Sequence, residues 1–441
     1  MERYDRLYRL YEEYDVERLR AYQEFVDVFP PVDSRVGLDY WADARRELEA
    51  RKGEIRDALG DGSPDGGTLA EVAAYATRDG AFTALDLLST HGRAVNALVL
   101  DVDETLRSAG RTDNEIPRDT LHLLTELVES GVPLVVCTGQ TLENVKGFTV
   151  QGLGNELVHS GDVSIVYEAG TGVFTPGQGR RTKQLLYEDL APAVRDVFTR
   201  VRSRALSAAP DPVRRGCHLQ GNEFNVTLKP NYETGSERAR ETIDLALVHL
   251  LDLLGAAVAA GIDRPAGAGG DAAPDEDRDD PAARADRGSA WARATYAAAD
   301  PEIAAVLDRQ DARPALDPGS VPERAASLFE RVDAAYYEAD AAEIGSRELN
   351  KAVGVEAALD VLGVDDPFLL VMGDSKSDLR VMEWVADRNA GIAAAPEHAS
   401  EGVLRHVRGG DGEGEGEGLV YAAGNAVAPL RIVYALNLLA D

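Results

Sequence analysis

The sequence contains few cysteines and no long apolar run. Its 441 residues include two cysteines, Cys137 and Cys217, which excludes a disulfide framework and a cluster of metal-bound thiolates. No stretch approaches about 18 uninterrupted apolar residues, the length that a membrane-spanning helix needs. The N-terminal residues 1–5 lack the apolar core of a signal peptide. We therefore predict a cytoplasmic protein that does not enter a membrane.

Basic residues are also scarce. Lys and Arg total 46, of which only six are Lys, against 77 Asp and Glu, and the formal net charge is -31. Phosphate backbones and anionic lipids would be repelled by such a chain, so we predict neither nucleic acid nor membrane as a partner. The acid-rich, lysine-poor balance resembles that of proteins from salt-loving (halophilic) organisms, in which salt screens the self-repulsion.

The chain is organised around residues 96–105, Asn-Ala-Leu-Val-Leu-Asp-Val-Asp-Glu-Thr. The apolar run 97–100 predicts a short strand of a sheet that is covered on both faces. Asp101 and Asp103 follow at positions i and i+2, so an extended backbone would point both carboxylates to the same side. A turn and helix start capped by Asp103 or Thr105 would explain the same residues. On this stretch alone both interpretations stay open.

The flanking pattern predicts an α/β fold. Residues 1–95 carry helical apolar spacing and predict a helical N-terminal extension that packs on the next domain or joins copies of the chain in a homo-oligomer. From residue 97 onward strands alternate with helices, which predicts a Rossmann-like, doubly wound parallel sheet. The predicted strands are 97–100, 133–137, 164–168, 368–372 and 390–395, and the predicted helices are 118–130, 351–362 and 427–439.

The middle of the chain is less regular. Residues 224–228 alternate like a half-exposed strand, and residues 236–254 and 322–337 predict helices. Residues 256–320 are rich in Ala, Gly, Asp and Pro and predict a low-complexity, loosely ordered insertion. Residues 409–418 predict an exposed acidic loop. We expect domains at 1–95, at 96–175 together with 340–441, and at 176–339.

Polar residues follow the predicted strands where each strand ends. Asp101 and Asp103 follow the first, Thr138-Gly139 the second, and Asp374 and Asp378 the strand 368–372, while Lys351 begins a helix. The carboxyl ends of parallel strands lie at one edge of a sheet, so we expect these groups to converge. Carboxylates, a lysine, a hydroxyl and a divalent cation together suit phosphoryl transfer.

These motifs resemble those of the haloacid dehalogenase (HAD) superfamily of phosphohydrolases. Asp101-Val-Asp-Glu-Thr105 resembles its first motif, Thr138 its second, Lys351 its third, and Gly373-Asp-Ser-Lys-Ser-Asp378 its fourth. The resemblance implies that Asp101 is the nucleophile and Asp103 the general acid and base. It also implies that Thr138, Gly139 and Lys351 bind the phosphoryl group. Mg2+ would be held by four aspartates, of which Asp103 would use its backbone carbonyl: Asp101, Asp103, Asp374 and Asp378.

The resemblance extends to the domain plan and the branch. About 200 residues separate Thr138 from Lys351, enough for an inserted α+β cap of the C2 type. Tyr167-Glu-Ala-Gly170 resembles the Cof-like branch, which includes sucrose-phosphate phosphatases. Within the cap, four residues are candidate contacts to substrate, although a surface-charge role explains them equally well: Arg214, Arg215, Asn225 and Lys229.

The function implied by the resemblance is that of a Mg2+-dependent phosphatase, which hydrolyses a small phosphorylated metabolite through an aspartyl-phosphate intermediate. A sugar phosphate is the expected substrate class. Two alternatives stay open. A phosphomutase of the same superfamily would return the phosphoryl group to the substrate, and a non-catalytic binding protein would keep the site without turnover. The intact set of acids argues against the last alternative.

Overall fold

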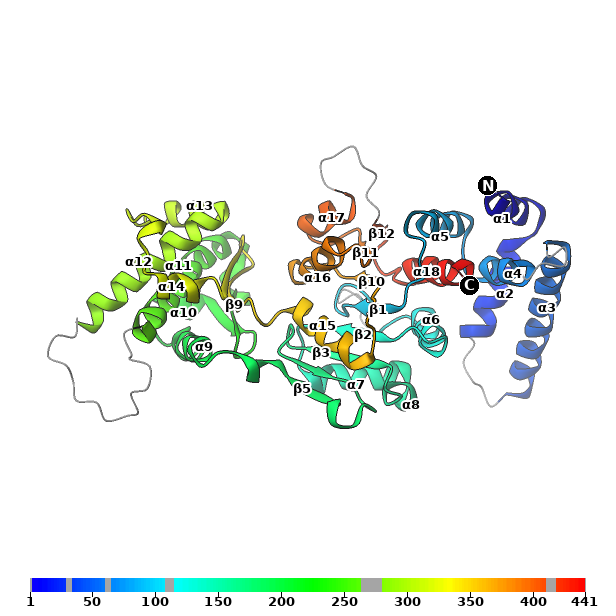
Figure 1. Cartoon of the computed structure of the whole chain (residues 1–441), viewed down its shortest axis with the longest axis horizontal. Coiled ribbons are helices and arrows are strands. Elements are labelled where there is room, and N and C mark those ends of the chain that lie inside the picture. Colours follow the sequence, from blue (N-terminus) through cyan, green and yellow to red (C-terminus); the bar gives the residue numbers. More distant parts are fainter. Residues whose placement is uncertain are drawn as a thin grey trace. The chain divides into compact units, whose positions relative to one another are not determined.

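The computed structural model describes residues 2–28, 34–59, 65–107, 115–262, 280–409 and 418–440. The chain divides into two compact units. Figure 1 labels helices and strands of both. The first unit comprises residues 1–184 and 351–441, and the second comprises residues 185–350. The second unit is therefore an insertion in the chain of the first.

Within the described residues, the first unit is built on an eight-stranded sheet of order β12-β11-β10-β1-β2-β3-β4-β5. Neighbouring strands are parallel from β12 to β3, and β4 is antiparallel to β3. Every residue of β1, β2, β3 and β10 is buried, which explains the largely apolar sequences of these strands. Ser164 of β3 is a polar exception, and its hydroxyl bonds the Thr175 hydroxyl. The strands are β1 Ala97–Leu100, β2 Leu134–Cys137, β3 Val163–Tyr167, β4 Gly172–Phe174, β5 Lys183–Leu185, β10 Leu369–Met372, β11 Gly391–Pro396 and β12 Leu419–Tyr421.

The strand order reverses beside β1. The chain runs from β1 to β2 and β3 on one side, then returns as β10, β11 and β12 on the other side. Right-handed crossovers in opposite directions put the connecting helices on opposite faces of the sheet, so the sheet is doubly wound and the predicted fold class is confirmed. The helices are α6 Arg118–Glu129, α7 Leu142–Leu153, α8 Asn155–Val158, α15 Lys351–Leu362, α16 Lys376–Asp387, α17 Glu401–Val407 and α18 Val427–Ala440.

The described part of residues 1–95 is largely helical, as predicted, and its last helix ends at His91. Its helices are α1 Glu2–Glu13, α2 Val16–Val28, α3 Arg35–Leu59, α4 Asp65–Tyr75 and α5 Arg78–His91. Their buried residues, among them Leu10, Leu48 and Ile55, belong to the same hydrophobic core as the sheet. The Asn437 side chain of α18 bonds both the N–H and the C=O of Val95, at 2.8 Å each, and so fixes the segment that leads into β1.

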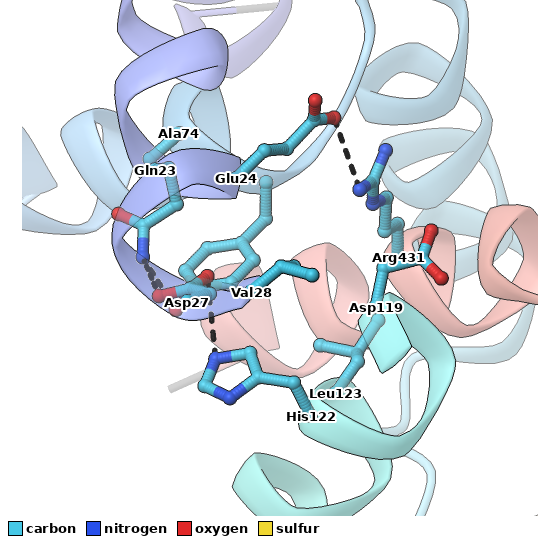
Figure 2. A pocket seen from close by; sticks show the side chains of 10 residues that line it. Gln23, Glu24, Asp27, Val28, Ala74, Asp119, His122, Leu123 and Arg431 are labelled. Carbon is cyan, nitrogen blue, oxygen red and sulfur yellow. Dashed lines mark hydrogen bonds and ion pairs between the residues drawn. The ribbon is translucent and has the colours of Figure 1, made fainter. Parts of the chain in front are cut away.

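An ionic cluster connects α2 with α6 and α18 (Figure 2). Asp27 Oδ2 lies 3.2 Å from His122 Nε2 of α6, and Glu24 Oε1 lies 3.1 Å from Arg431 Nη2 of α18. Gln23 Nε2 donates to Asp27 Oδ1 at 2.7 Å. The hydrogen bond to Asp27 raises the pKa of His122, although burial opposes the shift. These contacts orient the N-terminal helices on α6 and α18.

Within the described residues, the second unit contains a four-stranded antiparallel sheet of order β6-β7-β9-β8. Its strands alternate, so that Val226, Leu228 and Ile344 enter the core while Asn225, Thr227 and Glu343 lie on the other face. The strands are β6 Cys217–Gln220, β7 Asn225–Pro230, β8 Val332–Tyr337 and β9 Ala341–Ser346. The helices are α9 Pro192–Arg204, α10 Asp211–Gly216, α11 Gly235–Ile262, α12 Pro281–Ala299, α13 Pro301–Arg309 and α14 Glu323–Phe329.

Two predictions for this unit are wrong. Residues 256–262 and 280–320, expected to be loosely ordered, are largely helical in α11, α12 and α13. Small residues, not large apolar side chains, form the contact between α11 and α12. A Cβ on Gly288 of α12 would lie 2.2 Å from the Gly255 carbonyl oxygen of α11, so glycine allows the two helices to approach closely. Residues 322–337, expected to be one helix, form α14 and then β8. The rest of the predicted insertion, 263–279, and most of the acidic loop, 410–417, lie outside the described residues.

Among the described residues, one helix is long and apolar enough to cross a membrane, the stretch Arg238–Ile262 of α11. Of its most apolar 18-residue window, 56% is buried. Asp244 on this helix is buried and accepts from Arg309 Nε at 2.8 Å and from the Tyr336 hydroxyl at 2.5 Å. The helix therefore has the contacts of a central core helix.

Candidate active site

Asp101 lies directly beyond β1, where the strand order reverses. Its backbone N–H donates to Met372 O at 2.9 Å, which continues the ladder between β1 and β10. Val102 is buried, whereas Asp103 is partly exposed. The carboxyl edge of the sheet at this reversal is where open α/β folds bind their ligands.

The structure brings together Asp101, Lys351, Asp374 and Asp378, as the sequence predicted. Among the described residues, Asp101, Asp374 and Asp378 form a group in which one carboxylate oxygen from each residue lies within 4.8 Å of the other two. Lys351 Nζ donates to Asp101 Oδ1 at 2.7 Å and to Asp378 Oδ1 at 2.6 Å. The side chains of Lys351 and Asp101 are only 3% and 7% exposed. Residues about 250 positions apart thus form one buried ionic cluster.

Glycines allow the elements that carry these groups to approach. A Cβ on Gly354 would lie 2.3 Å from Val166 Cγ1, so only glycine lets α15 pack closely on β3 and bring Lys351 to the sheet edge. A Cβ on Gly373 would lie 2.3 Å from the Asp378 Cβ. Both glycines are therefore required by packing at the site.

Asp378 closes the loop after β10. Its Oδ2 accepts from the Ser375 N–H at 3.0 Å, as part of a capping box at the start of α16, and also from Ser375 Oγ at 2.6 Å. Thr105 Oγ1 donates to Asp374 Oδ1 at 3.4 Å, and the Ser400 N–H donates to the Asp374 carbonyl at 2.8 Å. The sequence Gly373 to Asp378 therefore forms a loop that fixes both carboxylates.

Protons are held unusually tightly by the acids of this cluster. Burial, together with the charges of Asp378 and Asp374, raises the pKa of Asp101 to about 8 although Lys351 opposes the shift. Burial and the Asp378 charge raise the pKa of Asp374 to about 6. Burial alone would lower the pKa of Lys351, but Asp101 and Asp378 raise it well above its ordinary value. The cluster thus has more negative charge than the lysine can compensate.

The donor set fits a hard divalent cation. Three carboxylates against one ammonium leave an excess of negative charge, and carboxylate oxygens are the ligands that Mg2+ takes in proteins. The raised pKa values of Asp101 and Asp374 have the same physical origin, because a proton supplies the positive charge that a cation would supply. Asp101, Asp374 and Asp378 are the residues that could hold the ion.

Thr138 and Gly139 lie at the end of β2, beside β1. Thr138 is buried, its Oγ1 accepts from the Gln140 N–H at 3.1 Å, and its carbonyl accepts from the Ala169 N–H at 3.0 Å. The helix that follows, α7, begins at Leu142 with Thr141 as its N-cap. Thr138 is therefore held in a loop of the sheet edge, and helix capping does not explain it. Gly139 is exposed in the same loop.

The Asp103 carboxylate has hydrogen-bond partners different from those of Asp101, Asp374 and Asp378. Asp103 Oδ1 accepts from Arg107 Nη2 at 2.8 Å and from Arg107 Nε at 3.1 Å, and Oδ2 accepts from Gln140 Nε2 at 2.5 Å. The residues from Asp103 to Arg107 form a turn, with Glu104 at φ 59°, so the described residues after Asp103 do not start a helix. Sequence reasoning named neither Arg107 nor Gln140, although their separations from Asp103 and Thr138, four and two residues, are short.

Two further side chains at this edge gave no signal in the sequence. His398 Nε2 lies 3.1 Å from the Glu104 carbonyl oxygen, and the Tyr421 hydroxyl donates to the Thr105 carbonyl at 3.3 Å. Both come from loops and strands that follow β10 by more than 20 residues. Only the parallel pairing of β10, β11 and β12 places them beside the turn after β1.

The residues predicted to contact substrate belong to the second unit. Arg214 forms an ion pair with Asp211 within α10, and Arg215 lies 4.0 Å from the same carboxylate. Asn225 Nδ2 donates to Glu343 Oε1 at 3.1 Å, and Lys229 Nζ lies 3.3 Å from Asp340 Oδ1. Each of these side chains thus has an acidic partner, and their role toward a substrate stays a prediction.

Comparison with known proteins gives structural resemblances only, since no family model and no curated protein matches the chain. A HAD/Cof-like hydrolase from Plasmodium vivax is 12% identical, with a TM-score of 0.43, over 80% of this chain and 98% of that one. An Aspergillus fumigatus trehalose-6-phosphate phosphatase is 11% identical, with a TM-score of 0.41, over 80% and 97%. A HAD subclass IIB sugar phosphatase is 14% identical, with a TM-score of 0.38, over 75% and 94%. The chemistry of this chain therefore has to be argued from its own residues.

Proposed function

We propose that the protein is a Mg2+-dependent phosphatase that hydrolyses a small phosphorylated metabolite through an aspartyl-phosphate on Asp101. One observation carries the proposal. A buried carboxylate at the reversal point of a parallel sheet shares its surroundings with a buried lysine and two further acids. With a divalent cation bound to the acids, this cluster would stabilise negative charge that develops on a transferring phosphoryl group.

Each residue has a defined task in this reaction. The Asp101 carboxylate attacks phosphorus, the Asp101–phosphorus bond forms, and the ester bond to the leaving alcohol breaks. Asp103 gives the departing oxygen a proton, then takes a proton from the water that hydrolyses the aspartyl-phosphate and releases inorganic phosphate. Lys351 bonds Asp101 Oδ1, which leaves Oδ2 as the attacking oxygen. Thr138 and Lys351 would bind phosphoryl oxygens.

Mg2+, when bound to Asp101, Asp374 and Asp378, would neutralise negative charge between the nucleophile and the phosphoryl group. The nearby thiol does not compete with Asp101 as nucleophile. Burial raises the pKa of Cys137 far above neutrality, so it stays a thiol, and the thiolate is the reactive form of cysteine. Asp101 is therefore the nucleophile in this proposal.

We propose a sugar phosphate as the substrate. The resemblance of the motifs supports this class, because Tyr167-Glu-Ala-Gly170 is similar to the Cof-like branch, which includes sucrose-phosphate phosphatases. The acidic composition supports a salt-rich cytoplasm as the place of action and argues against nucleic acid as a partner.

The test is release of inorganic phosphate from an aryl phosphate and from a panel of sugar phosphates, with Mg2+ and at high salt. We expect Asp101→Asn to lower turnover by about a thousandfold or more, because it removes the nucleophile. Asp366→Asn is the matched control, since its side chain is 87% exposed and pairs with Arg93. Circular dichroism should show both variants folded.

Three outcomes would contradict the proposal or redirect it. Equal turnover by wild type and Asp101→Asn would exclude Asp101 as nucleophile. Conversion of a sugar phosphate to its isomer without free phosphate would indicate a phosphomutase. Absence of turnover and of labelling by any phosphate ester would indicate a binding protein.

A further inference from the structure

We propose that Arg107 and Gln140 are positioning residues that fix the Asp103 carboxylate for proton transfer to the leaving group. The inference rests on the proposed function and adds two residues to it. Asp103 is the partly open acid of the site, with a side chain 43% exposed, while Arg107 is 12% exposed. A nearly buried guanidinium therefore holds an acid that substrate can reach.

The turn after β1 brings Arg107 to Asp103. The N–H groups of Leu106 and Arg107 both donate to the Val102 carbonyl at 3.1 Å, and Glu104 takes the left-handed conformation that closes the turn. The guanidinium then contacts Asp103 Oδ1 through both Nε and Nη2, at 3.1 and 2.8 Å. Two contacts from a planar group restrict rotation of the carboxylate more than one contact would.

Gln140 reaches the other carboxylate oxygen from the loop after β2. Its backbone is held at both ends, because its N–H donates to Thr138 Oγ1 at 3.1 Å and its carbonyl accepts from the Glu168 N–H at 2.9 Å. Its side-chain amide donates to Asp103 Oδ2 at 2.5 Å. The orientation of Asp103 is thereby linked to Thr138, the residue proposed to bind the phosphoryl group.

The bonded carboxylate keeps room for its reaction. Each carboxylate oxygen accepts up to two hydrogen bonds. Arg107 donates two to Oδ1 and Gln140 donates one to Oδ2, so one position on Oδ2 stays open for the leaving oxygen or for water.

A comparison of two substrates with different leaving groups distinguishes a positioning role from a general effect on folding. A nitrophenolate leaves without protonation, whereas a sugar alkoxide needs a proton from Asp103. The quantity to measure is kcat/KM, which covers the steps up to formation of the aspartyl-phosphate. We expect Arg107→Gln and Gln140→Ala to lower kcat/KM for a sugar phosphate by roughly 10- to 100-fold, part of the 10²- to 10⁴-fold that general acid catalysis supplies. For nitrophenyl phosphate we expect a change of less than about threefold, since no acid is needed.

A double-variant cycle with Asp103→Asn completes the test. If Arg107 and Gln140 act through Asp103, adding either substitution to Asp103→Asn lowers kcat/KM for the sugar phosphate no further. Arg107→Lys keeps the charge without the planar fork and should recover only part of the loss. Arg9→Gln, which breaks an exposed pair with Glu13 at the same i, i+4 spacing, is the matched control and should leave kcat/KM unchanged.

The outcomes separate this inference from the proposed function. Equal losses on both substrates, additive losses with Asp103→Asn, or unchanged kcat/KM in the single variants would each overturn the positioning role while turnover by wild type persists. Absence of turnover by wild type on every phosphate ester would instead overturn the proposed function. The inference would then fall with it.

Discussion

A single residue, Asp101, shows how surroundings change the chemistry of a common side chain. An aspartate at the surface is ionised at neutral pH, whereas burial and the neighbouring charges raise the pKa of Asp101 to about 8. Lys351 is 2.7 Å away but is shared with Asp378, so it cannot neutralise every acid in the cluster. The metal-free site therefore binds protons more tightly at physiological pH than a surface aspartate does.

This tight proton binding predicts that pH changes the stability of the metal-free protein and the stabilisation by Mg2+ in opposite directions. Asp101 and Asp374 have pKa values raised to about 8 and about 6, above the value of about 4 expected in the unfolded chain. The folded state thus binds protons more tightly than the unfolded state between pH 4 and 8, and metal-free stability falls as pH rises through that range. Mg2+ competes with these protons, so we expect the Mg2+-induced gain in Tm to increase from pH 6 to pH 8.

Thermal unfolding in Mg2+ and in a chelator, recorded from pH 5.5 to 8.5, measures this difference directly. Asp101→Asn cannot ionise at that position, so its metal-free stability should fall less with pH, and its Mg2+-induced gain should be smaller. A gain in Tm that is the same at pH 6 and pH 8 would show that protons and metal do not share the carboxylates.

At the scale of elements, the site depends on how closely α15 approaches β3. Lys351 is the first residue of α15, and Gly354 lies one turn later, where a Cβ would meet Val166 of β3 at 2.3 Å. Neighbouring elements in a close-packed interior cannot yield without cost. The position of the lysine is thus set by a glycine that carries no chemistry.

We expect Gly354→Ala to destabilise the protein by about 1–3 kcal/mol, the usual cost of overpacking, and to lower turnover by displacing Lys351. Adding Val166→Ala removes the atom that the new methyl group meets. The free energy of unfolding of the double variant should therefore be higher than the value expected from adding the two single effects. Chemical denaturation of the four proteins in the cycle gives the coupling.

Gly53→Ala in α3 is the matched control. Nothing lies within 4 Å of a Cβ at Gly53, so alanine should be neutral or stabilise the helix by up to about 1 kcal/mol. A Gly354→Ala protein as stable and as active as wild type would show that α15 can shift away from β3 without consequence for Lys351.

At the scale of the whole molecule, charge dominates. The net charge of -31 repels itself, and a Debye length of about 10 Å at 0.1 M salt leaves much of that repulsion unscreened. Many of the arginines form local pairs, such as Arg9 with Glu13 and Arg405 with Glu401, that contribute little each. Stability of the folded chain should therefore depend on ionic strength.

We expect Tm to rise when KCl increases from about 0.1 to about 1 M, where the Debye length falls to about 3 Å. Sorbitol at equal osmolality is the control, because it stabilises proteins without screening charge. Differential scanning calorimetry in both series measures the effect. A Tm that is unchanged by KCl, or that rises equally with sorbitol, would show that self-repulsion does not limit stability.

The local sequence determined the elements and the identity of the acids. Apolar runs such as 97–100 and 134–137 have few alternatives to a buried strand, and Asp101, Asp374 and Asp378 follow strands whose carboxyl ends share an edge. That much could be predicted because strand length, polarity and the parallel arrangement act over a few residues. The alanine-rich helices α12 and α13 could not, because their order comes from close packing against α11, which composition does not reveal.

The tertiary structure alone decided the contacts between distant residues. Lys351 bonds Asp101 across 250 positions, and Gln140 bonds Asp103 across 37. The pKa values of Asp101 and Asp374 depend on burial and on the sum of nearby charges, and neither quantity exists in an unfolded chain. The sequence supplied the reactive groups, and folding placed more negative charge at one sheet edge than the local lysine can offset.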